Sequence, residues 1–177
     1  MNKENGMDDE KTLHDSVASE VYDASQRPFD FIEEGKETAL ICESDSARRE
    51  KIGTILMEGN YLVTSPESAR EALKNMRFHI YQLVVLSESF DTDDPNKNSV
   101  LKYLESLAMN VRRDIFVVLL SDKLRTNDGM AAFNKSVNLI VNTSNVDDIE
   151  GIIRHGIAEN EHFYRVFKDS MQKLGRL

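Results

Sequence analysis

From residue 38 onward, short apolar runs alternate with longer segments whose apolar side chains recur every three or four residues. Runs of roughly four to eight apolar residues are typical of buried strands, and the longer spacing is typical of amphipathic helices. The pattern predicts strands at residues 39–42, 61–63, 83–86, 115–120 and 139–141. It predicts helices at 47–58, from Pro66 to about Met76, near 98–109, around 127–135 and, as a long last helix, at 146–174.

The strand segments lack alternating polar residues, which indicates a sheet covered by helices on both faces. Strands that alternate with helices predict βαβ units, because parallel neighbours need a crossover connection. We therefore predict an α/β fold of three layers, with a doubly wound parallel sheet of five strands and an extended last helix. Gly59 is placed to end the first helix, and Pro66 to begin the second.

The chain divides into three parts by composition. Residues 1–35 are polar, acidic and poor in large aliphatic side chains, which predicts a disordered N-terminal tail. Residues 36–160 hold the strand and helix pattern and form the predicted domain. Residues 161–177 extend the last helix beyond the length that the domain requires.

An alternative remains open within the N-terminal tail. Leu13, Val17 and Val21 recur every four residues and would share one stripe of a helix, so this segment is also a candidate docking helix. Pro28 and the apolar residues after it, Phe29, Phe31 and Ile32, are candidates to anchor the tail to the domain.

Composition narrows the possible environment and partners. The net charge of −9 disfavours phosphate backbones and anionic lipid surfaces, so we expect no nucleic-acid or membrane partner. The single cysteine, Cys42, excludes an internal disulfide and a cysteine-rich metal site, and predicts a cytoplasmic protein. No apolar run approaches the roughly 20 residues that cross a bilayer.

The strands are followed by polar residues at positions where doubly wound folds place their chemistry. These are Glu43 and Ser44, Ser87, Ser121 and Asn142. The stretches ALICESDSARREKIGTIL, YQLVVLSESF, FVVLLSD and NLIVNTSNVDDIEGII, with these residues, resemble CheY-like receiver domains of bacterial response regulators over residues 37–160. The resemblance implies the flavodoxin-like strand order 2-1-3-4-5 and a role in two-component signal transduction.

By this resemblance, most polar positions of a receiver are replaced. Glu43 matches the first of two magnesium-binding acids and Ser121 keeps a hydroxyl, whereas Ser44 replaces the second acid, Ser87 the phosphoacceptor aspartate, Asn142 the lysine and Leu139 the aromatic switch. A serine without a base is a poor nucleophile, and a lost carboxylate weakens a magnesium site. We therefore predict a degenerate receiver, or pseudo-receiver, with no metal, no cofactor and no enzymatic activity.

The last helix carries a further candidate interface. Its apolar residues are spaced alternately by four and three, with one polar member. We call the set Ile153, Ile157, Asn160, Tyr164, Phe167, Met171 and Leu174 the heptad seam. Such spacing predicts a helical homodimer, a docking helix for another protein, or a helix that folds back on its own domain. Gly151 and Gly156 weaken the helix by about 1 kcal/mol each relative to alanine.

These observations support a leading hypothesis and two alternatives. The leading hypothesis is a phosphorylation-independent receiver that acts as a signalling adaptor through protein–protein contacts. The first alternative is a small-molecule or nucleotide-binding domain that uses Ser44, Ser87, Ser121 and Asn142 as neutral hydrogen-bonding groups. The second is an atypically phosphorylated response regulator. The polar residues are equally well explained as a structural remnant that binds no ligand.

Overall fold

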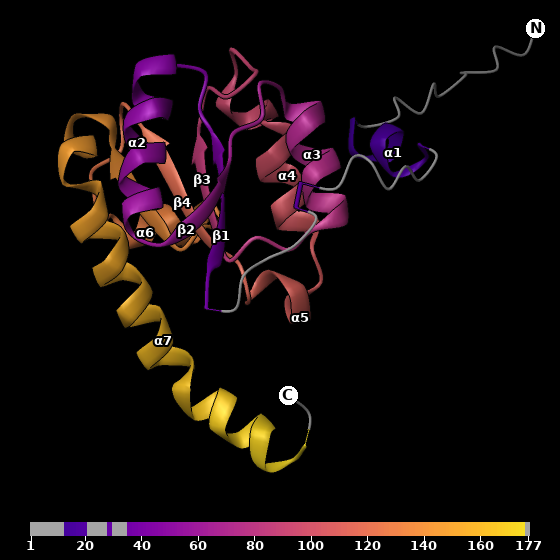
Figure 1. Ribbon diagram of the computed structural model, residues 1–177, viewed down its shortest axis with the longest axis vertical. Coiled ribbons are helices and arrows are strands. Elements are labelled where there is room, and N and C mark those ends of the chain that lie inside the picture. Colours follow the sequence, from indigo (N-terminus) through magenta and orange to yellow (C-terminus); the bar gives the residue numbers. More distant parts are fainter. Residues whose placement is uncertain (1–12, 21–27, 30–34, 176–177) are drawn as a thin grey trace, which may run out of the picture.

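The computed structural model describes residues 13–20, 28–29 and 35–175. Within these residues, the strands form one parallel sheet in the order β2-β1-β3-β4-β5, which confirms the predicted order (Figure 1). The strands are β1 (Glu37–Cys42), β2 (Tyr61–Thr64), β3 (Leu83–Ser87), β4 (Phe116–Ser121) and β5 (Leu139–Asn142). The helices of the domain are α2 (Ser46–Glu58), α3 (Ala69–Phe78), α4 (Ser99–Ser106), α5 (Met109–Arg112), α6 (Gly129–Asn134) and α7 (Ile149–Lys173).

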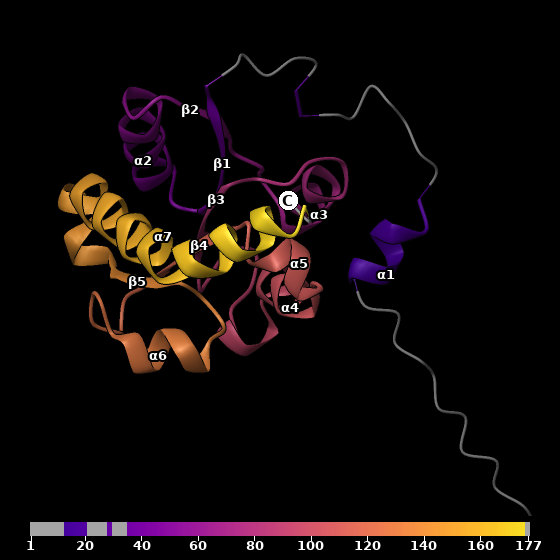
Figure 2. The same ribbon diagram turned by 90° about the horizontal axis from the view of Figure 1, so that it is seen from below.

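Helices cover both faces of the sheet, as the unbroken apolar strands indicate. On one face, α3, α4 and α6 pack against a cluster that includes Leu40, Val84 and Ile140. On the other face, α2 and α7 pack against a cluster that includes Ile41 and Val85 (Figure 2). Neighbouring residues of one strand point to opposite faces, so all five residues of β3 are buried. The three-layer architecture is therefore confirmed.

The start of α3 differs from the prediction. The helix begins at Ala69, because Ser68 caps it: the Ser68 hydroxyl accepts a hydrogen bond from the amide of Glu71 at 3.2 Å. The Glu71 carboxylate in turn accepts one from the amide of Glu67 at 2.8 Å. This reciprocal arrangement resembles a capping box and fixes the first turn three residues beyond the predicted start. The assignment of Pro66 to the first turn is wrong.

Two other predicted helices are shorter than the sequence pattern suggests. The segment predicted near 98–109 contains α4, which ends at Ser106, and the separate short helix α5. The last helix begins at Ile149, after the 3₁₀ turn η3 (Thr143–Asp148), in which the Asn142 side chain accepts from the Ser144 amide at 3.0 Å. A second 3₁₀ turn, η2 (Pro95–Lys97), precedes α4.

The N-terminal segment contains the helix α1 (Leu13–Ala18). Val17 of α1 is buried, which agrees with the docking-helix alternative for residues 13–18. The Phe29 ring packs edge-on against His79, with 5.2 Å between the ring centroids, which confirms its anchoring role. Val21, Phe31 and Ile32 lie outside the described residues.

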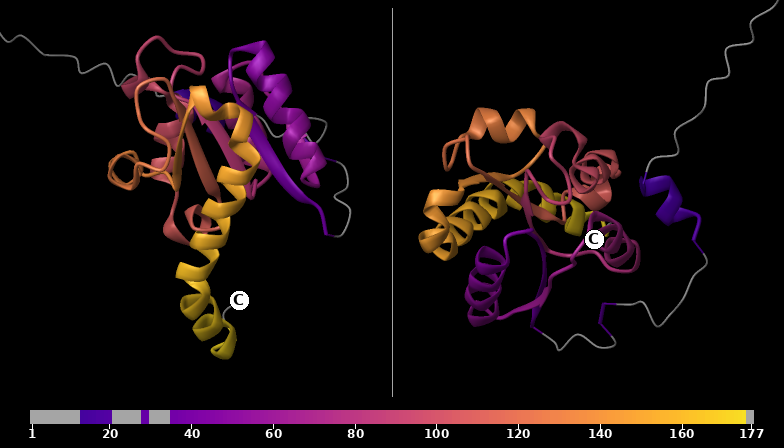
Figure 3. Two further views of the ribbon diagram at one scale, coloured as in Figure 1. Left: turned by 90° about the vertical axis from the view of Figure 1, so that its left-hand side faces the viewer. Right: turned by 90° about the horizontal axis from the view of Figure 1, so that it is seen from above.

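The last helix extends well beyond the sheet (Figures 1 and 3). Its first turns bury Ile149 and Ile153 against the sheet, and its remaining turns project past the amino ends of the strands. None of the described helices combines the length and the apolar character that crossing a bilayer requires.

Candidate functional site

The predicted site residues gather at the carboxyl edge of the sheet. Glu43 follows β1, Ser87 ends β3, and Ser121 and Asn142 are paired neighbours at the ends of β4 and β5. Glu43, Ser87 and Ser121 are buried, Asn142 is half-buried, and the side chain of Ser44 is exposed to solvent. We call these five residues the polar edge. The fold therefore brings Glu43, Ser87, Ser121 and Asn142 to the same edge of the sheet, whereas the side chain of Ser44 is exposed to solvent.

The most unusual feature of the polar edge is an arginine. The Nε atom of Arg48, on the first turn of α2, lies 3.2 Å from Oε2 of Glu43, whose side chain is only 1% exposed. Neither atom has a hydrogen-bond partner in the described part of the chain, so the contact between them is an ion pair without hydrogen-bond geometry. The second oxygen of Glu43 accepts from the amide of Asp45 at 2.9 Å.

Arg48 also lies close to the other carboxylates at this end of the sheet. Its Nη1 is 3.7 Å from Oδ1 of Asp122, and its Nη2 is 4.0 Å from Oδ2 of Asp45. Asp45 caps α2 by accepting from the Arg48 amide, and this hydrogen bond lowers the pKa of the Asp45 carboxyl. One guanidinium group thus stands among three carboxylates.

This arrangement does not fit the divalent cation that receiver folds hold at the same edge. Magnesium binds oxygen ligands in octahedral geometry and favours strong negative charge. Here the buried carboxylate of Glu43 is neutralised by a guanidinium group at 3.2 Å, and the adjacent residue is the uncharged, exposed Ser44. The described residues contain no cluster of three metal-ligating side chains.

Ser121 and Asn142 are engaged in local hydrogen bonds. The Ser121 hydroxyl accepts from the amides of Lys123 and Leu124, at 3.2 and 3.1 Å. The Asn142 amide group donates to the Leu124 carbonyl at 2.8 Å, while its oxygen accepts from Ser144. Both side chains hold the loops that follow their own strands, which leaves little capacity for a ligand.

Ser87 is supported by a residue that the sequence pattern did not single out. Asn98 is 1% exposed, and its Nδ2 donates to the Ser87 carbonyl at 3.1 Å and to the Glu88 carbonyl at 3.3 Å. Its Oδ1 caps α4 by accepting from the next amides of the helix. The Ser87 hydroxyl itself lies 3.2 Å from the Ser89 hydroxyl, which is no stronger a base.

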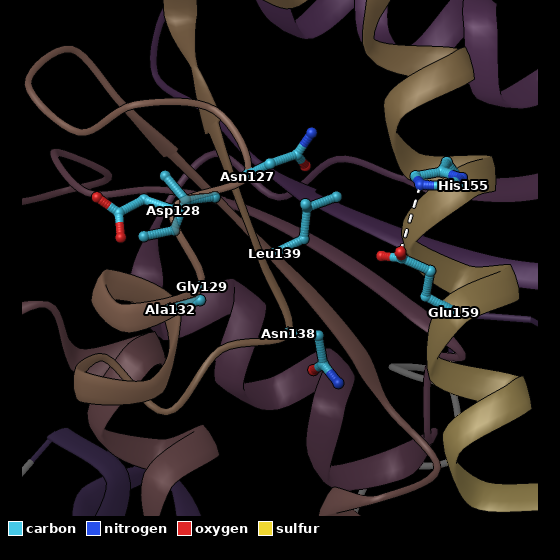
Figure 4. A pocket seen from close by; sticks show the side chains of 9 residues that line it. Asn127, Asp128, Gly129, Ala132, Asn138, Leu139, His155 and Glu159 are labelled. Atoms are coloured by element: carbon cyan, nitrogen blue, oxygen red, sulfur yellow. Dashed lines mark ion pairs between the residues drawn. The ribbon is translucent and has the colours of Figure 1, made fainter.

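A groove lies between α6 and α7, over β5. It has a volume of about 340 Å³, and Leu139 forms its floor (Figure 4). Gly129 and Ala132 line one wall, and His155 and Glu159, which form an ion pair at 3.4 Å when the histidine is protonated, line the other. Small side chains on α6 open this groove, because they leave the space above Leu139 unfilled.

Large apolar side chains are exposed on both helices that form this groove. Met130 and Phe133 on α6 are 71% and 80% exposed, and Phe163 and Val166 on α7 are 77% and 73% exposed. On α7, the positions 155, 159, 163 and 166 are spaced by four, four and three, so they lie on one side of the helix. The groove wall therefore continues along α7 as an apolar stripe, outside the heptad seam.

The heptad seam mostly faces the chain's own domain. Ile153 is buried, and Ile157 packs against the same cluster. Asn160 accepts a hydrogen bond from Nδ2 of Asn138 at 3.2 Å, and the Arg113 guanidinium lies 4.7 Å from the centroid of the Phe167 ring. Tyr164 and Met171 are half-buried, and Leu174 is exposed. The fold-back alternative therefore describes the contacts from Ile153 to Phe167.

The strand order and the crossover helices match the CheY-like fold of solved response-regulator receiver domains. A putative response regulator from Chloroflexus aurantiacus has 15% identity and a TM-score of 0.57, with 70% of this chain aligned to 98% of that chain. A receiver domain from Francisella, response regulator 1452, has 18% identity and a TM-score of 0.56 over 70% and 98% of the two chains.

A CheY-like receiver domain protein from Methanospirillum hungatei is similar to the same extent, with 18% identity and a TM-score of 0.56 over 72% and 98% of the chains. At these identities the likeness establishes the fold. No protein-family model and no curated protein sequence matches the chain. The specific role of the polar edge must therefore be argued from its own geometry.

Proposed function

We propose that this protein is a phosphorylation-independent pseudo-receiver, which acts as a signalling adaptor in the bacterial cytoplasm through protein–protein contacts and has no enzymatic activity. The ion pair between Arg48 and Glu43 carries the proposal. A receiver switch needs a divalent cation beside its phosphoacceptor, because the cation neutralises the incoming phosphoryl group. The guanidinium group of Arg48 supplies a permanent positive charge beside the buried carboxylate of Glu43 instead.

The surroundings of Ser87 support the same conclusion. A serine hydroxyl becomes a competent nucleophile when an adjacent base removes its proton. The hydrogen-bond neighbour of the Ser87 hydroxyl is another hydroxyl, that of Ser89. Ser87 is also 4% exposed, so its position suits a packed strand end better than a phosphate acceptor. These facts disfavour atypical phosphorylation.

The altered pocket is equally disfavoured as a small-molecule site. A ligand that bound Ser121 and Asn142 would have to replace hydrogen bonds of 2.8–3.2 Å that already hold the loops after β4 and β5. An unmet hydrogen bond of this kind costs about 1–3 kcal/mol. The polar edge is therefore best explained as a structural remnant that is closed by the chain's own groups.

Protein contacts have a better-defined surface on α6, β5 and α7. Exposed large apolar side chains are uncommon on free surfaces and mark interaction sites when they cluster. Phe133 and Phe163 lie on the two helices that form the groove over Leu139, and most of each side chain is exposed to solvent. We assign the adaptor contact to this groove and to the exposed apolar side chains of α6 and α7. A homodimer would form through Phe163 and Val166, because the heptad seam is engaged with its own domain.

The closed polar edge is tested by amide NMR of the full chain during titration with beryllofluoride and magnesium. We expect no saturable shifts near Glu43 and Ser87. Saturable shifts at these residues in the natural chain would contradict the proposal. A variant that combines Arg48→Ala, Ser44→Asp and Ser87→Asp restores the acids and removes the guanidinium, and it serves as the positive control.

The contact surface is tested by co-purification with matched variants. Phe133→Ser and Phe163→Ser each remove an exposed apolar side chain from a helix that forms the groove. We expect each to reduce recovery of a specific partner by tenfold or more, which corresponds to about 1.4 kcal/mol or more of binding free energy. Met57→Ser removes a comparably exposed apolar side chain, 58% exposed, from α2, and should leave recovery unchanged. Equal loss in all three variants would refute the assignment. Light scattering of the Phe163→Ser variant tests the dimer separately.

A further inference from the structure

The short helix α1 lies against α3 and α4, on the same face of the sheet (Figures 1 and 2). Val17 is only 2% exposed, and Leu13, four residues earlier, packs against the core cluster of that face. The His14 ring lies 5.0 Å from the ring of Tyr103 on α4. Leu13 and Val17 lie on one side of α1 and pack toward α3 and α4. We call the surface of these two helices that α1 covers the α3–α4 slot.

Three basic side chains of α3 hold the end of α1. The Glu20 carboxylate forms ion pairs with Arg70 and with Lys74, the latter at 2.8 Å. Arg77 donates through Nη1 to the carbonyls of Val17 and Glu20, each at 2.9 Å. The Val17 carbonyl also accepts from the Glu20 amide at 3.2 Å, and Glu20 lies two residues beyond α1, so this arginine ties the last turn of α1 and the residue that follows it to α3.

The three basic residues form one stripe. Arg70, Lys74 and Arg77 are spaced by four and three, so they share one side of α3. On the bound segment, Leu13, Val17 and Glu20 follow the same spacing. The apolar residues of the segment pack in the slot, and its carboxylate pairs with the basic stripe. The site can therefore recognise a helix by both its apolar side chains and its negative charge.

A helix as short as α1 cannot be stable by itself. It has 6 residues, whereas isolated helices shorter than about 12–15 residues are marginal in water. Its helical form therefore depends on the contacts with α3 and α4. Because docking and folding of the segment are coupled, loss of the contacts releases an unfolded segment and exposes the slot together with its basic stripe.

We propose that the α3–α4 slot, with Arg70, Lys74 and Arg77, is a receptor site for a short acidic amphipathic helix of a partner protein, and that α1 closes it in cis. The matching helix carries two apolar residues four apart and a carboxylate three residues later. This site is separate from the α6–α7 groove and does not depend on the function proposed for that groove. A tethered segment competes at an effective concentration in the millimolar range, so α1 sets a threshold that the partner must exceed.

The proposal is tested with the full chain and a fluorescein-labelled synthetic peptide of residues 11–22, measured by fluorescence anisotropy. In the variant Val17→Asp, the segment cannot bury its apolar side chain, and the slot is open. We expect the peptide to bind this variant at least tenfold more tightly than the natural chain, in which α1 occupies the slot. Circular dichroism confirms that the domain remains folded, and Glu20→Lys in the full chain provides a second opened variant that keeps Val17.

Charge reversal supplies the matched control. A peptide with Glu20→Lys should bind the Val17→Asp variant at least tenfold more weakly than the natural peptide. Adding Arg70→Glu and Lys74→Glu to that variant should reverse this preference. Equal binding of the two peptides would overturn the basic stripe as a recognition element. Absence of binding to both folded opened variants would overturn the receptor site itself. Exchange of α1 between two natural chains, detected as a dimer that Val17→Asp abolishes, would support the slot with a second copy as the helix donor.

Discussion

Gly156 of α7 lies directly against Phe116 of β4. A Cβ atom at Gly156 would come within 3.1 Å of Cζ of Phe116 and 3.3 Å of Cδ2 of Leu139. A Cβ atom at Gly151, on the same helix, would meet nothing within 4 Å. The first glycine thus lets α7 approach the sheet closely, whereas the second has no packing role.

The two glycines predict opposite responses to alanine. Gly151→Ala should stabilise the protein by about 0.5–1 kcal/mol, because alanine favours the helix and costs less backbone entropy. Gly156→Ala gains the same propensity but must displace Phe116 or Leu139, which are both buried, so it should be less stable than Gly151→Ala by about 1 kcal/mol or more. Urea denaturation measures both. Equal stabilisation by the two substitutions would contradict the close approach at Gly156.

The ion pair of Arg48 and Glu43 predicts strong coupling. Arg48→Gln leaves a buried carboxylate without its counter-charge and should cost about 2–3 kcal/mol, somewhat less than a fully buried pair because the arginine is partly exposed. The double variant with Glu43→Gln should cost at least about 1 kcal/mol less than the sum of the single variants. Arg48→Lys, which keeps the charge, should fall between the natural chain and Arg48→Gln. Additive single effects would show that the pair is energetically unimportant.

We expect substitution of Asn98 to lower the free energy of unfolding by more than is usual for a residue in a loop. Asn98→Ala removes the cap of α4 and the side-chain donor to the carbonyls of Ser87, which still accepts from the Phe90 amide, and of the half-buried Glu88, so it should cost about 2 kcal/mol. Asn96→Ala, two residues earlier and exposed, should change stability by less than about 0.5 kcal/mol. Chemical denaturation distinguishes them. Similar small losses in both variants would refute the bridging role of Asn98.

His79 predicts a dependence of stability on pH. Burial lowers the pKa of His79 below its ordinary value of 6.5, and its Nε2 lies 2.7 Å from the Thr38 hydroxyl. The unfolded chain therefore binds the proton more readily, so its contribution to stability is complete above about pH 6.5 and declines as the pH falls from there toward the lowered value. The difference in stability between the natural chain and His79→Gln should shrink over this range. A constant difference from pH 7.5 to pH 5 would contradict the assignment.

The sequence predicted the sheet well because each strand is a short apolar run between helical patterns. All strand predictions lie within two residues of the structure, from β1 at Glu37–Cys42 to β5 at Leu139–Asn142. The start of α3 was misplaced, because Pro66 and Ser68 are both suitable near a helix start and the reciprocal hydrogen bonds of Glu71 decide between them. Local competition of this kind is not visible in a hydrophobic pattern.

The site was predicted in part. The polar residues after each strand could be read from the sequence, because parallel strands bring their carboxyl ends to one edge. The role of Arg48 was not predicted, since a charged residue on the first turn of a helix usually faces solvent. A hint existed in its position one turn beyond Glu43 and Asp45. Asn98 was missed for a similar reason: its double role depends on carbonyls 10 and 11 residues earlier in the chain.

The heptad seam was predicted as an apolar line with one polar member, and its spacing did not determine which surface it contacts. Four-three spacing suits any surface that a helix can pack against. Here Asn138 and Arg113 provide that surface, and the lone polar residue, Asn160, pairs with an asparagine of its own domain. The two glycines illustrate the same limit, since only the position of Phe116 distinguishes them.

The length of α7 gives the protein a mechanical property. Its 25 residues extend about 37 Å at 1.5 Å per residue. Its first turns are buried in the core, and Asn160 and Phe167 contact the domain farther along the helix. A tilt of about 10° about that buried end moves the C-terminal end by about 6 Å, the size of a large side chain. A contact that tilted the helix beside β5 would therefore displace the C-terminal end of α7 by more than it displaced the turns at β5.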